Sequence, residues 1–278
     1  MSSGSDLIAD INACAPGAGE LALWWLGQHS FVIKIRTRVM YLDPFLTNMK
    51  GRQVPSLLSP SDITNADVIL GTHDHADHID RPAWPALAKA SPQAKFVVPA
   101  LLRDKLSADL KIPADRFIGL DDGTTASCAG LKISAVAAAH EFLDQDPVTG
   151  EYPYLGYIVE GAGTALYHAG DCCIYEGLQT KLKRWKFDLM ILPINGRDAV
   201  RYAANCIGNM TYQEAADLAG ALQPRLTIPA HYDMFATNLG DPKAFADYMR
   251  VKYPKLKVLV CTHGERLILP AVTATFRV

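Results

Sequence analysis

The chain has 278 residues, of which 49% are hydrophobic and 20% charged, and its formal net charge is −2; these values are typical of a globular protein with a full-sized core. No block of five or six like charges occurs, so the sequence argues against nucleic acid as a partner. No apolar run reaches the roughly 18 residues of a membrane span, and residues 1–10 lack the basic and apolar regions of a signal peptide.

In the first half, three short strand patterns precede a fourth that ends at a histidine cluster. The second and third are joined by the turn-prone Thr37-Arg38, which predicts an antiparallel meander. Two helix patterns follow, one beginning at Pro82 and one stopped by Pro113. The predicted strands are 21–26, 31–36, 39–42, 68–71 and 96–98, and the predicted helices are 82–90 and 101–110.

The second half repeats this pattern. Gly161-Ala162-Gly163 is typical of a hairpin turn between two strands. Thr211, followed three residues later by Glu214, forms a capping-box sequence that predicts a helix over 212–222. The remaining predicted strands are 131–137, 154–160, 164–168, 187–192, 226–228, 258–261 and 267–269.

Each half mixes strands and helices, and no low-complexity linker divides them. We therefore expect an α/β (α+β) protein in which two sheets pack face to face with helices outside. Residues 21–278 are predicted to form a single domain, preceded by an N-terminal extension over residues 1–20. The six cysteines show no C-x-x-C pair or regular spacing. They predict reduced thiols and a cytoplasmic protein rather than a disulfide framework.

Three histidines and two aspartates stand within six consecutive positions, directly after the strand that ends at Gly71. Imidazole nitrogens and carboxylate oxygens are ligands for zinc and for harder divalent ions such as manganese. The run His73-Asp74-His75-Ala76-Asp77-His78 therefore predicts a metal site on a loop at the end of a strand. The alternative is a solvated polar loop or a purely structural metal site.

This run resembles the H-x-H-x-D-H signature of the metallo-β-lactamase superfamily. His140, Asp171 and His231 each follow an apolar strand, in the order that the family pattern expects. The resemblance implies a four-layer αββα sandwich and two divalent metal ions, zinc or manganese. It implies one ion held by His73, His75 and His140, a second held by Asp77, His78 and His231, and a bridging Asp171.

The resemblance also implies the reaction, which is hydrolysis by a hydroxide that the two metal ions activate. Asp77 and Asp171 would be the catalytic residues, and Asp77 would also orient the hydroxide.

Within the superfamily, the chain is similar to the L-ascorbate-6-phosphate lactonase-like branch, from about residue 21 to residue 270. The implied substrate is a small anionic metabolite, namely a phosphorylated sugar lactone or ester. The matching segments include Trp24-Trp25-Leu26-Gly27, Leu42-Asp43-Pro44-Phe45, Leu166 through Asp171, Asn209-Met210-Thr211 and Ile228-Pro229-Ala230-His231-Tyr232-Asp233.

Four further residues each have two interpretations. Asp43 ends a strand and is either a hydrogen-bond acceptor for a ligand imidazole or a turn residue. His29, between two strands, either faces the pocket or forms a turn. His168 lies in an apolar strand and is expected to pack in the interior rather than to act in catalysis. His263 is the alternative to His231 as the last ligand, but its neighbours are typical of a hairpin turn.

The loop after the strand over 187–192 carries the candidate substrate ligands. Asn195, Arg197 and Arg201 are expected at the same edge of the sheets as the metal ligands, and guanidinium groups suit a phosphate or carboxylate. The alternative is a solvated loop with two surface arginines. Cys172-Cys173 is expected to pack, because metal-activated water makes a thiol nucleophile unnecessary.

Two other functions compete with lactone or ester hydrolysis. One is a phosphodiesterase of the same fold, acting on nucleic acid or phospholipid. The other is a metal-binding protein without catalysis, in which no exchangeable position is left on the metals. The expected partner is a small-molecule substrate, without nucleic acid or membrane, and a homo-oligomer is compatible with the sequence.

Overall fold

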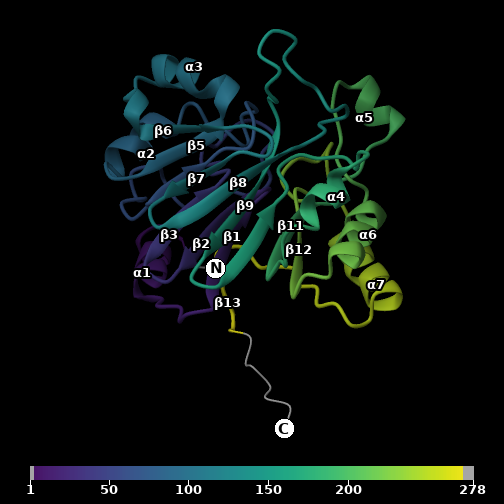
Figure 1. Cartoon of the computed structure of the whole chain (residues 1–278). Helices are drawn as coiled ribbons and strands as arrows, with labels where there is room; N and C mark the ends of the chain where they lie inside the picture. Colours follow the sequence, from purple (N-terminus) through teal and green to yellow (C-terminus); the bar gives the residue numbers. More distant parts are fainter. Residues whose placement is uncertain (1–2, 272–278) are drawn as a thin grey trace.

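The computed structural model describes residues 3–271, and two β-sheets pack face to face in it with helices on both outer sides (Figure 1). The sandwich that the sequence predicts is therefore confirmed. Residues 1–2 and 272–278, at the ends of the predicted extension and domain, lie outside the described residues. Among residues 3–271, no helix is both long and apolar enough to cross a membrane.

The first sheet contains the meander and the strand before the histidine run. Its strands are β1 (Leu21–Gly27), β2 (Ser30–Ile35), β3 (Arg38–Leu42), β4 (Val68–Leu70), β5 (Lys95–Pro99), β6 (Phe117–Leu120) and β13 (Arg266–Leu269). The order is β13-β1-β2-β3-β4-β5-β6. The strands β3 to β6 are parallel, so the segments that follow β3 and β4 leave the sheet at the same edge.

The second sheet contains the strands that lead to the later predicted ligands. They are β7 (Thr125–Cys128), β8 (Leu131–Ala137), β9 (Leu155–Gly161), β10 (Thr164–His168), β11 (Leu189–Pro193) and β12 (Leu226–Ala230), in the order β12-β11-β10-β9-β8-β7. The predicted hairpin joins β9 and β10, with φ of 48° at Ala162 and 83° at Gly163, as a type I′ turn requires. The strands β10, β11 and β12 are parallel.

Helices lie outside each sheet (Figure 1). On the side of the first sheet are α1 (Gly4–Ala13), α2 (Trp84–Ala90) and α3 (Ala100–Leu110), with the 3-10 turn η1 (Ala114–Arg116). On the side of the second are α4 (Leu178–Leu182), α5 (Ala199–Ala203), α6 (Tyr212–Leu222) and α7 (Pro242–Lys252). The capping box predicted at the start of α6 is confirmed by reciprocal hydrogen bonds between Thr211 and Glu214.

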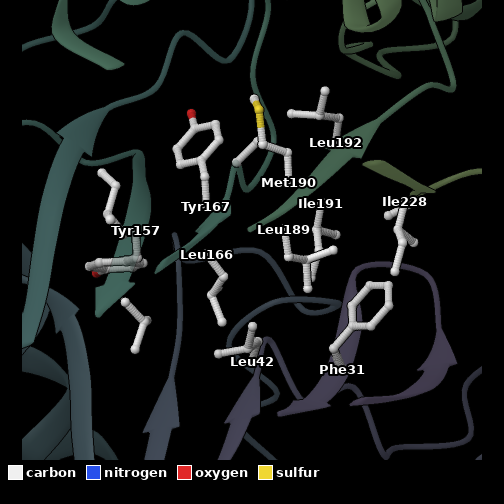
Figure 2. Packing of buried hydrophobic residues seen from close by; sticks show 14 of the residues in the cluster. Phe31, Leu42, Tyr157, Leu166, Tyr167, Leu189, Met190, Ile191, Leu192 and Ile228 are labelled. Carbon is white, nitrogen blue, oxygen red and sulfur yellow. The ribbon is translucent and has the colours of Figure 1, made fainter. Parts of the chain in front are cut away.

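The core between the sheets follows from the two-residue period of the strands. Phe31 and Leu42 of the first sheet face Leu166, Leu189 and Ile228 of the second (Figure 2). Alternate residues of the second sheet, Tyr167, Met190 and Leu192, lie on the opposite side of their strands in the same view. Because both faces of each sheet are covered, the strands are apolar almost throughout.

The segment predicted as an N-terminal extension contains α1, which packs on the outer face of the first sheet. Leu7 and Ile11 are completely buried in a cluster with Trp24. Asp10 accepts a 2.7 Å hydrogen bond from the indole of Trp24, and Lys34 donates to the carbonyl of Ile11 at 2.7 Å. Residues 4–13 thus share the core of the sheet that follows them.

One predicted strand is wrong. Residues 258–261 form a single bridge, between Val258 and Thr227 of β12. Five residues later the chain bridges Trp25 of β1 at His263. The segment therefore crosses from one sheet to the other, and pairs with each at one residue only. Leu259 and Val260 are exposed in this crossing segment, so a short apolar run alone does not establish a paired strand.

Candidate metal centre

The segments that follow β4, β8, β10 and β12 bring the predicted ligands together at one edge of the sandwich. Their ligand atoms form compact groups, and within each group all atoms lie within 4.8 Å of one another. One group is His73, His75, His140 and Asp171; another is Asp77, His78 and His231; a third is His29, His78 and Asp171. Nitrogen ligands lie about 2.0–2.1 Å from a zinc ion, so small side-chain shifts would let the atoms of such a group share one.

Asp171 lies between the groups, with one carboxylate oxygen toward each side. Its Oδ1 is 3.3 Å from Nε2 of His78 and 3.1 Å from Nε2 of His231. Its Oδ2 is 3.7 Å from Nε2 of His140. This arrangement is the one that the predicted bridging role needs, and that role stays a prediction.

The donor chemistry fits divalent metal ions. Within residues 3–271, Nε2 of His78 and Oδ1 of Asp171 are buried and have no hydrogen-bond partner. An unpaired buried polar atom costs about 1–3 kcal/mol, and coordination of a cation would satisfy both atoms. Imidazole nitrogens and carboxylates are, moreover, a ligand set that both zinc and manganese accept.

Charge keeps the aspartates ionised. Burial raises the pKa of Asp77, but His78 and His231 outweigh it, so the pKa is lowered. The pKa of Asp171 is lowered in the same way, with His231 as the strongest opposing group. Burial lowers the pKa of His231, yet Asp171 and Asp77 raise it overall to about 9. The carboxylates are thus in the form that binds cations.

Asp43 lies behind the histidine run, fully buried at the end of β3. Its Oδ2 accepts hydrogen bonds from Nδ1 of His78 at 2.7 Å, from Nε2 of His168 at 2.9 Å and from the hydroxyl of Thr72 at 2.9 Å. Its Oδ1 accepts from the backbone N–H of Thr72 at 2.8 Å. These contacts leave Nε2 of His78 facing the metal groups.

Gly170 sets the position of Asp171. Its φ is +60°, and a Cβ there would lie 2.9 Å from the carbonyl oxygen of Leu155 and 2.9 Å from Cβ of Thr72. Only glycine fits a left-handed residue packed this closely against two other segments. The glycine that precedes Asp171 in the matching segment Leu166 through Asp171 therefore has a steric reason.

Gln28, in the turn between β1 and β2, contacts two predicted ligands. Its amide nitrogen donates to Oδ2 of Asp77 at 2.7 Å and lies 3.0 Å from Nε2 of His231. The backbone carbonyl of Gln28 accepts a hydrogen bond from the backbone N–H of His231 at 3.0 Å. His231 has a φ of 58° there. The first sheet thereby fixes the last predicted ligand, which belongs to the second.

A pocket of about 330 Å³ opens beside the metal groups. Asn238 lines it, and its Oδ1 accepts a 2.8 Å hydrogen bond from the amide of Asn195. Because this bond uses the amide oxygen of Asn238, its amide nitrogen is the atom available to donate a hydrogen bond to a molecule in the pocket. The lining residues are His75, Asp77, His140, Asp171, Asn205, Cys206, Ile207, His231, Phe235, Thr237 and Asn238.

The predicted substrate residues do not line this pocket directly. Arg197 makes two 2.7 Å hydrogen bonds to Glu214 and borders a neighbouring hollow of about 300 Å³. Arg201 donates to the carbonyls of Asn195 and Leu239, and so holds two loops together. Asn195 is buried behind Asn238. Their substrate roles stay predictions.

The remaining histidines and the cysteine pair fall outside the pocket lining. His168 bonds Asp43 in the interior, as expected. His263 pairs with Asp233 at 2.6 Å and stacks on Trp25, and it belongs to none of the ligand groups found in residues 3–271. Cys172 and Cys173 are buried, and burial raises the pKa of Cys172 to about 12, which agrees with packing.

The sequence interpretation missed Gln28, Thr72 and Asn238. Thr72 adjoins the histidine run, so its position was a usable signal. Gln28 and Asn238 stand in ordinary polar loops, and nothing local distinguishes them. Their contacts with the site depend on the meeting of the two sheets.

A family model described as "Beta-lactamase superfamily domain" matches residues 38–232. A "UPF0173 metal-dependent hydrolase" from Thermococcus onnurineus is 30% identical over 246 residues, which cover 88% of this chain and 98% of the relative. Another protein of that description, from Caldivirga maquilingensis, is 25% identical over 250 residues, covering 89% and 98%. Among solved structures, Igni18, "a novel metallo hydrolase" from Ignicoccus hospitalis, superposes with a TM-score of 0.70 at 24% identity, covering 90% and 98%.

Proposed function

The chain belongs to the beta-lactamase superfamily and, within it, to the UPF0173 metal-dependent hydrolase family, and on that basis we propose that it is a two-metal hydrolase of lactones or esters. The observation that carries the proposal is the convergence of seven predicted ligands into adjoining groups beside a pocket. His73, His75, His140 and Asp171 would hold one divalent ion, zinc or manganese. Asp77, His78, His231 and Asp171 would hold the other.

Bound there, two divalent cations would lower the pKa of a water molecule and polarise the scissile carbonyl. The protein's own groups orient the reactants. Gln28 donates to Oδ2 of Asp77; since each carboxylate oxygen has two acceptor sites, Asp77 could bind the ion and also accept a hydrogen bond from the attacking water. The amide N–H groups of Asn238 would donate to the carbonyl oxygen as negative charge develops on it. Asn195 acts through Asn238, by holding its amide in that orientation.

The best candidate substrate is a small anionic one, with a phosphorylated sugar lactone first. The metal pocket and the hollow beside Arg197 share Cys206 and Ile207 in their walls. A substrate with its lactone at the metal groups could therefore extend an anionic group toward Arg197. The side chain of Arg197 is 43% exposed although it is paired with Glu214, so it keeps room for a second partner.

Turnover of a substrate panel tests the reaction class. The panel holds phosphorylated and unphosphorylated lactones, phosphodiesters and amides, each assayed with zinc and with manganese. We expect metal-dependent lactone hydrolysis that Asp171→Asn reduces to background. Asp104→Asn, in a side chain 90% exposed on α3, is the matched control and should keep full activity.

Three results would change the proposal. Full activity in the metal-stripped protein would refute metal-dependent hydrolysis. Faster turnover of phosphodiesters than of lactones would reassign the substrate class. Arg197→Gln should raise KM for the phosphorylated lactone alone, and an equal effect on both lactones would remove Arg197 from the substrate site.

A further inference from the structure

His29 is a buried histidine for which the proposed mechanism has no use. It lies in the turn between β1 and β2 and is 0% exposed. Neither Nδ1 nor Nε2 has a hydrogen-bond partner within residues 3–271. Because each unpaired buried polar atom is costly, a ring whose only role was packing would be better replaced by an apolar one.

The ring of His29 lies against two other unpaired atoms. Its Nδ1 is 3.8 Å from Oδ1 of Asp171, and Nε2 of His78 is 3.3 Å from the same oxygen. All of these atoms lack a hydrogen bond within residues 3–271, and the three residues form a group with ligand atoms within 4.8 Å of one another. Three buried ligand atoms thus converge on one point.

Gln28, the residue before His29, contacts Asp77 and His231 and so separates them from the group formed by His29, His78 and Asp171. The amide nitrogen of Gln28 already contacts Oδ2 of Asp77 at 2.7 Å and Nε2 of His231 at 3.0 Å. Two groups that the family resemblance assigns to the second ion therefore have a partner within the protein. Across the described part of the chain, His29, His78 and Asp171 have none at the atoms that face one another.

We propose that His29 is a ligand of the second metal ion, together with His78 and Asp171. This assignment rests on the proposed two-metal function. A neutral imidazole ring offers the lone pair that a metal ligand must have, and both ring nitrogens of His29 are without a hydrogen-bond partner in residues 3–271. The added nitrogen favours zinc, cobalt or iron(II) over manganese at this position.

The assignment makes the two halves of the centre unequal. His29 and His78 are buried and do not line the pocket, whereas His75, in the other group, is exposed and lines it. The second ion would therefore lie on the buried side of the centre. An exchangeable position for water or substrate is left on the side of His75.

Metal titration of the purified full chain tests the role of His29. Zinc affinity is measured by competition with a chelator, and the cobalt(II) absorption spectrum reports the ligands. We expect two ions per wild-type chain, and in His29→Ala one site weakened by more than the roughly 10–100-fold that loss of a supporting hydrogen bond causes, with an altered cobalt spectrum. His263→Ala is the matched control and should bind as the wild type does.

Two ions bound by His29→Ala with wild-type affinity and spectrum would overturn the assignment but leave the proposed function standing. A wild-type chain that binds no metal would overturn both. Should His29→Ala fail to fold, anomalous diffraction from zinc-loaded wild-type crystals decides. A peak about 2.0–2.1 Å from a ring nitrogen of His29 supports the assignment, and peaks only at the other histidines refute it.

Discussion

Replacing Asp43 with asparagine tests how the protein orients its candidate ligands. Three donors meet at Oδ2 of Asp43, from His78, His168 and Thr72. In the asparagine variant, an amide nitrogen at the position of Oδ2 would donate hydrogen bonds. The three groups that face it are donors as well, so none of them could accept without moving its proton. His78 can adapt only by moving its proton from Nδ1 to Nε2, because a neutral imidazole has a single N–H. That proton would then point at Asp171, 3.3 Å away, where a metal ion needs a lone pair.

The magnitude of the effect follows from the hydrogen bonds that the substitution breaks. A hydrogen-bond partner behind a metal ligand is worth about 10–100-fold in metal affinity, or about 1.4–2.7 kcal/mol. Breaking a buried pair by removing one charge costs roughly 3–5 kcal/mol of stability. Burial raises the pKa of Asp43, but His78 and His168 lower it overall, so the charged form is the one that the substitution removes.

Chelator competition measures the metal affinity, and thermal or urea unfolding of the metal-free protein measures the stability. Asp67→Asn is a suitable control, because Asp67 is partly buried and accepts bonds from Arg38 and the backbone of Val39, at the opposite end of β3 from Asp43. It should leave metal affinity unchanged. If Asp43→Asn binds zinc as tightly as the wild type, the orienting role of Asp43 is refuted.

Three other substitutions test the fold around the site. Gly170→Ala should destabilise the protein by about 2–3 kcal/mol, because its Cβ would meet the carbonyl of Leu155 at 2.9 Å at a positive φ; unchanged urea unfolding would contradict this. Ile11→Ala should cost about 2–5 kcal/mol if α1 belongs to the core, and a loss below 0.5 kcal/mol, roughly a surface effect, would show that it does not. Glu214→Gln should cost about 1 kcal/mol at pH 7. Burial raises the pKa of Glu214, but Arg197 lowers it overall. The contribution of Glu214 to the free energy of unfolding is therefore present at neutral pH and is lost as the pH falls below about 4.3. Calorimetry should show a difference between variant and wild type at pH 7 that shrinks at pH 3.

The strands and the ligand run could be predicted because both depend on local sequence. A short apolar run bounded by turn residues is recognisable by itself, and few residue types bind a divalent ion. The run from His73 to His78 therefore indicated a candidate site, and the family resemblance added His140, Asp171 and His231, each after an apolar strand. The structure brings all seven residues to one edge.

Other features depend on contacts that no local pattern contains. Gln28 reaches His231 across a separation of 203 residues, and only the packing of one sheet on the other creates that contact. The strand predicted over 258–261 is wrong for the same reason, since the segment crosses from one sheet to the other and bridges each at a single residue. The helix α7 is a different case, because the sequence analysis did not predict it although a local signal was present. It begins at Asp241-Pro242 with a side-chain cap, which is a start signal from which a helix is predictable.

Burial explains why stability and turnover should respond to different residues. His29, His78 and Asp43 are 0% exposed, so changes there leave unpaired atoms inside the core and act on metal affinity and stability together. His75 is a proposed ligand too, but it is exposed and lines the pocket, so its loss should lower metal affinity and rate with little effect on the fold. A variant series that mixes both kinds would show a spurious link between stability and activity. Measuring bound metal for each variant before its rate separates the two effects, and His75→Ala should then lose metal affinity and rate at wild-type stability.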